Sequence, residues 1–464
     1  MDRIAQKLRG KTSNTTASTT NNAAEKSTRC ARNHRRPKQP PLDDNGCEEL
    51  MVATVGNVNS GKSTLVGVLT YGMLDDGNGA ARLPVMRHPH EQTTGRTSDI
   101  SYTYVKHPSG ELDLSNSNNN SESSRIYTFI DLAGHEQYLR TTISGLTTGY
   151  SDVAFVCISN VITKITLEHI NLLASLEIPM VLLFTRTDIV PQDVYNRLIQ
   201  RMTSCMTSNK RKLFRIETVQ DIERIPSLGI VPYMQISCKT GYNIDMIWKV
   251  LSQYKKITRS LPCNFSIDHV YHIQGYGTVL SGISGITINK GDKLYIGPFQ
   301  RGAFVPLEVR TLHNDYRMFV DQLPAGKRGS MSIRLPNKSS GRKGITRGMI
   351  VVQEPPKNLS NKFRAKLRII HHHTSIAVGY QVFANCGMVG ATVRFLELIP
   401  LTRTGEIDKQ ASGTDSGSVI LRSGQLADVT MEFINDQLHF LEVGQKIIFR
   451  EGHTKGIGKI IELL

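Results

Sequence analysis

The sequence predicts an α/β domain with a mostly parallel sheet, followed by two all-β barrels. In the first half, short apolar runs each lead into a turn or a helical pattern, as strands of a parallel sheet do; they span 51–55, 127–130, 153–158, 180–184 and 233–236. From about Cys263 onward helix-period patterns nearly vanish, and short β-rich runs alternate with turns that contain Gly or Pro. Such alternation is typical of β-barrels.

The length and texture of the chain divide it into a tail and several domains. Its 464 residues suffice for about two to four domains. We place the α/β domain at 49–257 and the barrels at 258–355 and 356–464. Residues 1–48 are poor in large apolar side chains, so we expect a disordered basic tail. Its basic cluster at 35–38 leaves RNA contact and an organelle transit peptide as alternatives.

Other stretches carry simpler predictions. The runs 115–124 and 402–418 are of low complexity and predict flexible loop insertions. Apolar residues at helical spacing in 168–176, ended by Pro179, predict a helix of the core. For His371, His372 and His373, strand alternation favours structural histidines over a metal site, because the middle side chain points to the opposite face.

Composition bounds the compartment and the partners. The net charge of +16 favours polyanionic partners, RNA above all, although a basic tail on an ordinary enzyme remains the alternative. No apolar stretch reaches the roughly 20 residues that cross a bilayer, and no secretory signal is present, so we expect a soluble protein without membrane contact. The 7 cysteines form no CxxC pair and favour a reducing, cytoplasmic setting.

The strongest motif is a GxxxxGK[ST] sequence between an apolar strand and a helical pattern, the order that a phosphate-binding loop requires. Its members are Gly56, Asn57, Val58, Asn59, Ser60, Gly61, Lys62 and Ser63. We expect backbone N–H groups to surround the phosphates, Lys62 to reach the β- and γ-oxygens and Ser63 to coordinate Mg²⁺. Thr64, the next residue of the helix, completes the predicted phosphate-binding set.

Two further segments supply candidates for the reaction itself. Asp131 ends the strand at 127–130 and is expected to hold the metal through water, opposite Ser63. Gly134 offers a backbone N–H near the γ-phosphate, and His135 stands where a side chain can orient the attacking water. Thr97, in the polar segment 93–98, is the candidate for a second hydroxyl on Mg²⁺; a plain linker is the alternative for this segment.

Two segments after later strands predict selection of guanine. Asp188 follows the strand at 180–184 and can accept hydrogen bonds from guanine N1–H and N2–H, a donor pair that adenine lacks. Thr185 and Arg186 precede it in the same segment. After the strand at 233–236, a short turn can present a backbone N–H to the guanine O6; it comprises Ser237, Cys238 and Lys239. The predicted ligands are therefore GTP and GDP.

Together these motifs lie within a longer resemblance, which covers about 49–464. The chain resembles the GTP-binding protein 1 and 2 branch of the elongation factor Tu-like translational GTPases. Similar segments are VGNVNSGKST at 55–64, HEQTTGRTSDIS at 90–101, FIDLAGHEQYLRTT at 129–142, GYGTVLSG at 275–282 and FREGHTKGIGKI at 449–460. The resemblance implies a GTP-binding domain with two barrels, a switch between GTP and GDP states, and hydrolysis of GTP with Mg²⁺.

By the same resemblance, Lys62 and Ser63 hold phosphate and metal, and Asp188 reads guanine. Lys62, Thr97 and His135 are the implied catalytic residues, with Thr97 and Asp131 completing the metal shell and His135 positioning water. Val58 would lie beside His135 in an apolar gate. The implied partners are the ribosome and aminoacyl-tRNA or another RNA, or RNA-decay machinery, for a protein expected to be a monomer.

Three positions depart from the family pattern. Asn59 replaces the usual Asp, and its carboxamide makes K⁺ an additional candidate cofactor. Arg186 replaces a Lys, and its guanidinium can stack on a base plane. Arg96 stands where elongation factor Tu has an apolar residue before the switch threonine, so the apolar gate is only half present. The short basic tail also stands where the animal members carry a long acidic extension.

The last barrel offers a candidate RNA contact. The loop around 450–456 resembles the tRNA-facing loop of elongation factor Tu and would bring Arg450, His453 and Lys455 near a phosphate backbone. A glycine-rich hairpin between two strands is the alternative, and both can hold together.

Two other classes of function compete with a GTPase. One is a non-catalytic, GTP-gated adaptor in RNA decay or ribosome rescue, which Thr97, Asp131 and His135 disfavour. The other is an ATP-dependent RNA helicase, which also uses a phosphate-binding loop; the sequence shows no second helicase core.

Overall fold

The computed structural model describes most of the chain from Cys47 to Leu464. The described residues are 42, 47–108, 124–148, 151–208, 211–225, 230–257, 263–336, 344–357, 359–370, 375–387, 389–402, 406, 419–434, 437–451 and 453–464. The predictions for nearly all of the tail at 1–48, for most of the insertions at 115–124 and 402–418 and for His371, His372 and His373 fall outside them.

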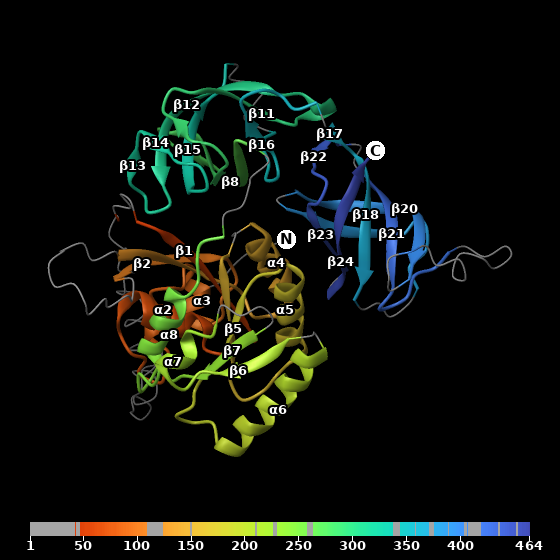
Figure 1. The fold of residues 1–464 in the computed structure, drawn as a ribbon. Coiled ribbons are helices and arrows are strands. Elements are labelled where there is room, and N and C mark those ends of the chain that lie inside the picture. The colour runs from red at the N-terminus through yellow and green to blue at the C-terminus, as the bar shows by residue number, and fades with distance from the viewer. Residues whose placement is uncertain are drawn as a thin grey trace, which may run out of the picture. The chain divides into compact units, whose positions relative to one another are not determined.

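A seven-stranded, mostly parallel sheet forms the first domain, in the order β2-β3-β1-β4-β5-β7-β6 (Figure 1). The strands are β1 (Glu49–Gly56), β2 (Ser101–Pro108), β3 (Ser124–Asp131), β4 (Val153–Ile158), β5 (Met180–Phe184), β6 (Lys212–Arg215) and β7 (Ile230–Gln235). Every neighbouring pair is parallel except β2 and β3. β1, β4 and β5 are buried throughout, because helices cover both faces of the sheet.

The helices of this domain pack against both faces of the sheet. They are α2 (Lys62–Tyr71), η1 (Ala80–Arg82), α3 (Pro89–Thr94), η2 (Glu136–Tyr138), α4 (Leu139–Thr148), α5 (Lys164–Ser175), α6 (Gln192–Ser208), α7 (Val219–Ile222) and α8 (Ile244–Ser252). Side chains of α2, α7 and α8 share one apolar core, and those of α4, α5 and α6 share another. The helix expected within 168–176 is part of α5.

The first barrel closes through pairing of β11 with β12. Its strands are β8 (Phe265–Ile273), β9 (Gly277–Ser284), β11 (Lys293–Gly297), β12 (Val305–Asn314), β15 (Arg328–Arg334) and β16 (Ile350–Val352). β13 (Phe319–Val320) pairs antiparallel with the end of β12, β10 (Ile288–Asn289) pairs with β14 (Gln322–Leu323), and η3 (Gln300–Gly302) lies between β11 and β12.

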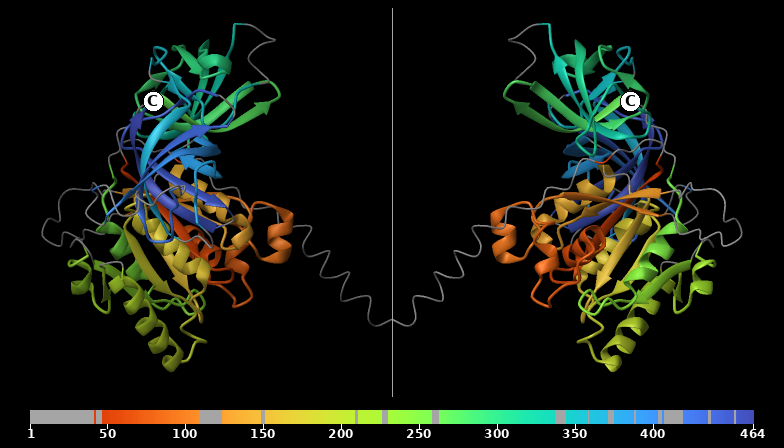
Figure 2. Two further views of the ribbon diagram at one scale, coloured as in Figure 1. Left: turned by 90° about the vertical axis from the view of Figure 1, so that its right-hand side faces the viewer. Right: turned by 90° about the vertical axis from the view of Figure 1, so that its left-hand side faces the viewer.

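The second barrel is closed in the order β18-β21-β20-β19-β23-β24. Its strands, whose curvature Figure 2 shows, are β18 (Lys362–Ile369), β19 (Gln381–Cys386), β20 (Val389–Leu401), β21 (Leu426–Phe433), β23 (Lys446–Glu451) and β24 (His453–Leu463). β17 (Leu359–Ser360) pairs with β22 (His439–Phe440). Along β18 buried positions alternate with exposed or half-buried ones, as a barrel wall requires. The predicted α/β domain followed by two barrels is confirmed.

The two helices α4 and α5 contact the second barrel. Ile448 of β23 is 1% exposed and packs with residues of both helices, Leu139 and Ile143 among them. Beside it, Lys446 Nζ donates to the Leu176 carbonyl at 2.6 Å, just past the end of α5.

The first barrel contacts the first domain through Tyr316, whose hydroxyl donates to Glu49 Oε1 at 2.8 Å, at the start of β1.

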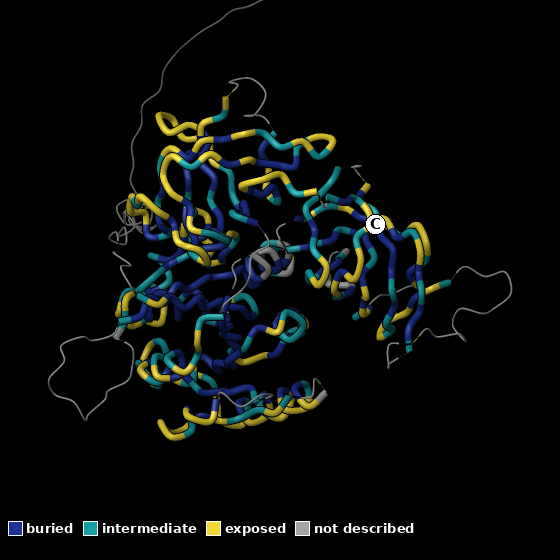
Figure 3. The backbone as a smooth tube through the Cα atoms, turned by 45° about the horizontal axis from the view of Figure 1, so that its top comes forward, coloured by how far each residue is buried: buried dark blue, intermediate teal, exposed yellow. Residues whose placement is uncertain are grey.

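The carboxyl ends of the parallel strands position the candidate site. The segments that follow β1, β3, β5 and β7 all leave the same edge of the sheet, because neighbouring strands run in the same direction. β1, β4 and β5 are buried, and exposed positions lie in connecting segments and along helices such as α6 (Figure 3). None of the helices in the described part of the chain combines the length and apolarity needed to cross a bilayer.

Candidate functional site

The loop after β1 turns tightly before α2. Gly56, Asn59 and Gly61 have φ of 139°, 60° and 87°, a region that suits glycine and, less often, asparagine. A Cβ on Gly56 would lie 2.3 Å from the Cys157 carbonyl oxygen, so no side chain fits there. Gly61 directly precedes α2, which places the first backbone N–H groups of the helix at the loop.

Lys62 folds back over this loop. Its Nζ donates to the Asn57 carbonyl at 2.8 Å, and the side chain is buried. Burial lowers the pKa of the Lys62 ammonium, and Asp131 opposes that shift by favouring the charged form. A lysine ammonium held beside a loop that leads into a helix N-terminus is suited to bind phosphate.

Ser63, Thr97 and Asp131 converge on one point behind the loop. Ser63 Oγ donates to Asp131 Oδ2 at 2.6 Å and lies 2.8 Å from Thr97 Oγ1, which is itself 3.1 Å from the same carboxylate oxygen. The other carboxylate oxygen accepts from Thr54 Oγ1 at 3.2 Å. Burial raises the pKa of Asp131, and Lys62 together with these hydroxyl donors opposes that shift.

This set of oxygens fits magnesium. Two hydroxyls and one carboxylate, with no sulfur or imidazole, are the hard ligands that Mg²⁺ prefers when substrate phosphates and water complete its shell. Among the described residues no group of three or more His, Cys, Asp or Glu side chains is arranged to hold a metal. The three residues predicted at 63, 97 and 131 therefore lie together.

Glu91 fixes the segment that carries Thr97, a role that the sequence did not reveal. The Glu91 side chain is 2% exposed, and its Oε1 accepts from Ser98 N at 2.7 Å and Asp99 N at 3.2 Å. Its Oε2 accepts from the N–H groups of Arg87 and His88 at 3.0 and 3.1 Å. One carboxylate thus ties both ends of the loop around Thr97 together.

Gly134 and His135 follow β3 and lie against the phosphate-binding loop. A Cβ on Gly134 would lie 2.4 Å from Lys62 Nζ and 2.6 Å from the Gly56 carbonyl oxygen. His135 is half-buried, and its Nδ1 accepts from Gln137 N at 3.1 Å. Its ring makes an edge contact with Tyr138 at 6.1 Å between centroids.

The segments after β5 and β7 meet each other and the loop. Thr185 Oγ1 donates to the Ser60 carbonyl at 2.9 Å. Ser237 Oγ donates to Asp188 Oδ1 at 2.7 Å, and the same hydroxyl accepts from Lys239 N at 3.3 Å. Asp188 is exposed and Cys238 half-buried. The structure thus brings the two predicted base-binding segments together.

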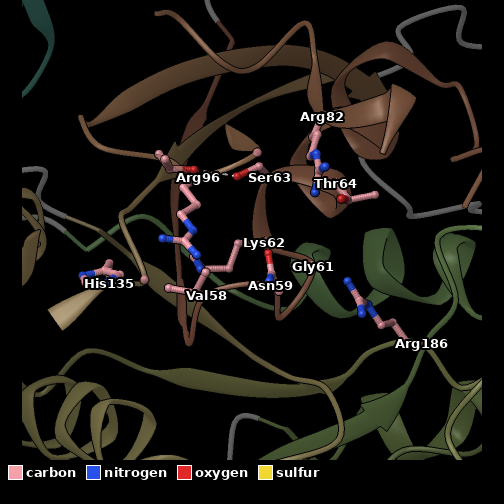
Figure 4. A pocket seen from close by; sticks show the side chains of 13 residues that line it. Val58, Asn59, Gly61, Lys62, Ser63, Thr64, Arg82, Arg96, His135 and Arg186 are labelled. Carbon is pink, nitrogen blue, oxygen red and sulfur yellow. Dashed lines mark hydrogen bonds between the residues drawn. The ribbon is translucent and has the colours of Figure 1, made fainter. Parts of the chain in front are cut away.

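An open cavity lies beside the loop between β1 and α2. Most of its lining residues were predicted from the sequence; they are Val58, Asn59, Gly61, Lys62, Ser63, Thr64, Thr97, Gly134, His135 and Arg186 (Figure 4). Arg82, Gly95 and Arg96 complete the lining. Asp188 and residues 237–239 do not line it, so the cavity brings together the residues predicted to bind phosphate and not those predicted to bind the base.

His169 supports the loop from α5. Its Nδ1 accepts from Gly56 N at 3.2 Å, and the ring is fully buried. Burial, helped by the charge of Lys62, lowers the pKa of His169 to about 3, so the ring is neutral and able to accept. The prediction of a core helix for this segment missed the contact, because spacing alone does not show which core residue reaches the loop.

The candidate RNA residues lie elsewhere, on the second barrel. The Arg450 guanidinium lies over the Phe383 ring, 5.8 Å from its centroid. His453 is the first residue of β24 and Lys455 the third, and their side chains are outside the described part of the structure.

Comparison with known proteins decides the family. Residues 48–257 match the elongation factor Tu GTP binding domain. GTP-binding protein 1 of Xenopus laevis is 33% identical over 446 residues, 91% of this chain and 64% of that protein. GTP-binding protein 2 of Mus musculus is 31% identical, over 89% of this chain and 69% of that protein. The chain belongs to the GTP-binding protein 1 and 2 family.

Membership of this family confirms the predicted resemblance to elongation factor Tu-like GTPases. The chain spans 64% of the length of the Xenopus relative. Solved structures share the fold: SelB from Methanococcus maripaludis with a GTP analogue has a TM-score of 0.61 at 20% identity, covering 90% of this chain and 80% of that one. The GTP-bound Ski7 GTPase-like domain of S. cerevisiae has a TM-score of 0.66 at 14% identity, covering 90% and 99%.

Proposed function

We propose that the protein binds GTP and hydrolyses it to GDP and phosphate, as a switch of the translational GTPase class. The observation that carries this proposal is the convergence of Ser63, Thr97 and Asp131 within 3.1 Å of one another, behind a loop that presents Lys62 to phosphate. A metal ligand from the switch segment would link the conformation of that segment to the γ-phosphate.

The residues of the site divide the work of the reaction. Mg²⁺, held by Ser63 and Thr97 and through water by Asp131, would supply neutralisation of the phosphate charges. The loop residues at 56–64 bind the phosphates through backbone N–H groups, and the Gly134 N–H faces the γ-phosphate. Because most of the catalysis in this class comes from positioning and electrostatics, the fixed geometry of the loop is the main contribution of the protein.

His135 is proposed to position the attacking water. Its Nδ1 already accepts from Gln137 N, so in a neutral ring the hydrogen is on Nε2. His135 would then orient the water by donating to its oxygen. The water oxygen bonds to the γ-phosphorus, the bond to the bridging oxygen breaks, and the water proton leaves with the inorganic phosphate.

Selection of guanine is proposed for Asp188, with Thr185, Arg186 and the turn at 237–239 completing the base site. The Ser237 hydroxyl holds one carboxylate oxygen of Asp188 at 2.7 Å, which leaves the other oxygen for a donor on the base. This arrangement supports GTP over ATP, and so disfavours a helicase.

The proposal extends to partners, compartment and domain limits. We propose that the protein acts in the cytoplasm as a monomer on ribosome, tRNA or RNA-decay complexes, with Arg450, His453 and Lys455 near RNA. The net charge of +16 supports a polyanionic partner.

We also propose domain limits at 49–257, 258–355 and 356–464. They are supported by the strands: the last strand of the first barrel, β16, ends at Val352, and β18 begins at Lys362.

Potassium is a proposed second cofactor. Asn59 lines the cavity with φ of 60°, and its carboxamide oxygen is a suitable ligand for a monovalent cation beside the phosphates. Equal GTPase rates in K⁺ and in a bulky cation that does not coordinate would contradict this assignment.

Steady-state hydrolysis of GTP by the full chain, with and without ribosomes, tests the proposal. We expect slow turnover alone, faster turnover with ribosomes, and a loss of orders of magnitude in His135→Ala with unchanged GTP binding. Gln137→Ala is the matched control, because it keeps the backbone N–H that holds the ring. Tight GTP binding without turnover under any condition would instead support the GTP-gated adaptor.

A further inference from the structure

The phosphate cavity carries more positive charge than the family motifs account for. Besides Lys62, three arginines line it, Arg82, Arg96 and Arg186. Of the described residues that line this cavity, none is an aspartate or a glutamate. Guanidinium groups stay charged at any physiological pH and bind phosphate oxygens with fixed, forked donors. The three arginines differ in what their side chains contact.

Arg82 has a packing role. A Cβ on Gly79 would lie 2.5 Å from Arg82 Nε, and a Cβ on Gly95 would lie 2.8 Å from Arg82 NH2. The guanidinium is thus packed against the backbone of both glycines, and it supports the switch segment at Gly95. Arg186 lies on the side of the cavity near Gly61, away from His135, which suits the proposed base site (Figure 4).

Arg96 is held from both sides by its neighbours in the chain. Gly95 N donates to the Glu91 carbonyl at 2.7 Å at the end of α3. Thr97 Oγ1 lies within 3.1 Å of Ser63 Oγ and Asp131 Oδ2. The backbone of Arg96 is therefore fixed one residue away from the proposed metal ligand, on the segment expected to respond to the γ-phosphate.

The Arg96 side chain is placed to meet a ligand in the cavity. It extends from the switch segment toward Val58 of the phosphate-binding loop, on the side of the cavity where His135 lies (Figure 4). The side chain is exposed, and within the described part of the chain no carboxylate pairs with its guanidinium. The apolar gate expected from the family is thus replaced on one side by a cation.

We propose that Arg96 is a catalytic arginine supplied by the chain itself, which contacts the γ-phosphate and stabilises the charge that develops during hydrolysis. This inference rests on the proposed GTPase function and deepens it. As the water oxygen bonds to phosphorus and the bond to the bridging oxygen breaks, negative charge shifts onto the leaving oxygen of GDP. Arg96 donates hydrogen bonds to the γ-phosphate oxygens and to the leaving oxygen, and its guanidinium stays protonated throughout.

The expected size of the effect follows from related chemistry. An arginine that stabilises the transition state of phosphoryl transfer accelerates it by about 10³ to 10⁵. Arg96 is exposed in this structure, so we expect an effect of about 10² or more. Binding of GDP, which lacks the γ-phosphate, should change by less than about threefold.

Three variants of the full chain test the assignment: Arg96→Ala, Arg96→Lys and Arg197→Ala. Arg197 is an exposed residue of α6 that does not line the cavity, so Arg197→Ala is the matched control. The readouts are single-turnover GTP hydrolysis, GDP affinity, and the affinity for GDP with aluminium fluoride, which mimics the transferring phosphoryl group without turnover.

We expect Arg96→Ala to lose about 10² in hydrolysis and to lose the gain in affinity that aluminium fluoride gives, while GDP affinity stays unchanged. Arg96→Lys should fall between this variant and the wild type. The catalytic role would be overturned if Arg96→Ala hydrolysed GTP and bound GDP with aluminium fluoride as the wild type does, or if its GDP affinity fell as much as its rate of hydrolysis. Either result would leave the proposed function standing. A wild-type chain that hydrolyses no GTP with or without ribosomes would overturn the function itself.

Discussion

Glu91 and Ser98 are joined by two hydrogen bonds to one carboxylate oxygen: both N and Oγ of Ser98 donate to Glu91 Oε1 at 2.7 Å. The same carboxylate caps its own helix through His88 N at 3.1 Å. Ser98, which is half-buried, directly follows Thr97, so its bonds to the buried Glu91 set where the proposed metal ligand lies. The segment that carries Thr97 is thus held by the carboxylate of a glutamate in α3.

We predict that Glu91→Gln weakens the preference for GTP over GDP by about tenfold. The amide replaces one acceptor oxygen by an NH₂ group that faces backbone N–H donors, and hydrogen bonds to a charged group contribute about 1.5–3 kcal/mol each. Equilibrium binding of a fluorescent GTP analogue and of GDP measures the ratio. Glu223→Gln on the exposed surface is the control. An unchanged ratio would show that Glu91 does not order the switch.

His169 makes stability depend on pH. Its folded pKa of about 3 lies below the unfolded value near 6.5, so the unfolded chain binds the proton more readily. The contribution of the neutral His169 ring to the free energy of unfolding is therefore fully present above about pH 6.5 and is lost as the pH falls toward 3. Between pH 7.5 and 5.0 this one group should lower the free energy of unfolding by about 2 kcal/mol.

The variant His169→Gln tests this pH dependence, because its amide oxygen can still accept from Gly56 N but does not titrate. Denaturant unfolding at pH 7.5 and 5.0 should show a smaller decrease for the variant than for the wild type. If both chains lose the same free energy between the two pH values, the buried neutral ring is not responsible.

Gly134→Ala should impair nucleotide binding by tenfold or more. The added Cβ would lie 2.6 Å from the Gly56 carbonyl oxygen and 2.7 Å from the Asn57 carbonyl carbon, both backbone atoms, so the loop must shift. Gly344→Ala is the control, since its nearest neighbour is a Phe299 ring atom at 3.4 Å. Titration with fluorescent GDP and GTP measures the loss, and wild-type affinity in Gly134→Ala would contradict the close packing.

Ile448→Ala should destabilise the chain by about 2–4 kcal/mol, because its buried side chain fills the contact with α4 and α5. Ile461 is 38% exposed on β24 of the same barrel, so Ile461→Ala should cost under about 1 kcal/mol. Thermal unfolding compares the two. Equal, small losses would mean that Ile448 is not packed as described.

The parts of the site that the sequence predicted are those carried by local motifs. The phosphate-binding loop, Asp131 and Asp188 each follow an apolar strand, and the order of strands then brings them to one edge. Glu91 and His169 escaped prediction for a different reason. A buried glutamate in a polar segment and a histidine within an apolar helix look ordinary until the fold shows what they contact.

Arg96 illustrates the same limit from the other side. The sequence shows Arg96 directly before Thr97 and predicts that one of the two apolar residues of the gate is missing. Only the structure shows that the segment aims this side chain into the cavity (Figure 4). The direction of a side chain in an irregular segment depends on tertiary contacts, here those of Glu91, Ser63 and Asp131, and periodicity carries no information about it.

Competition for bound fluorescent GDP in the presence of Mg²⁺ tests the central claim most directly, that one site built on Lys62, Asp131 and Asp188 holds a guanine nucleotide. We predict displacement by GTP and GDP at stoichiometric levels and none by ATP at a hundredfold excess, with Asp188→Asn shifting preference from guanine to xanthine nucleotides. Displacement by ATP as readily as by GTP, or no retention of guanine nucleotide at all, would contradict it.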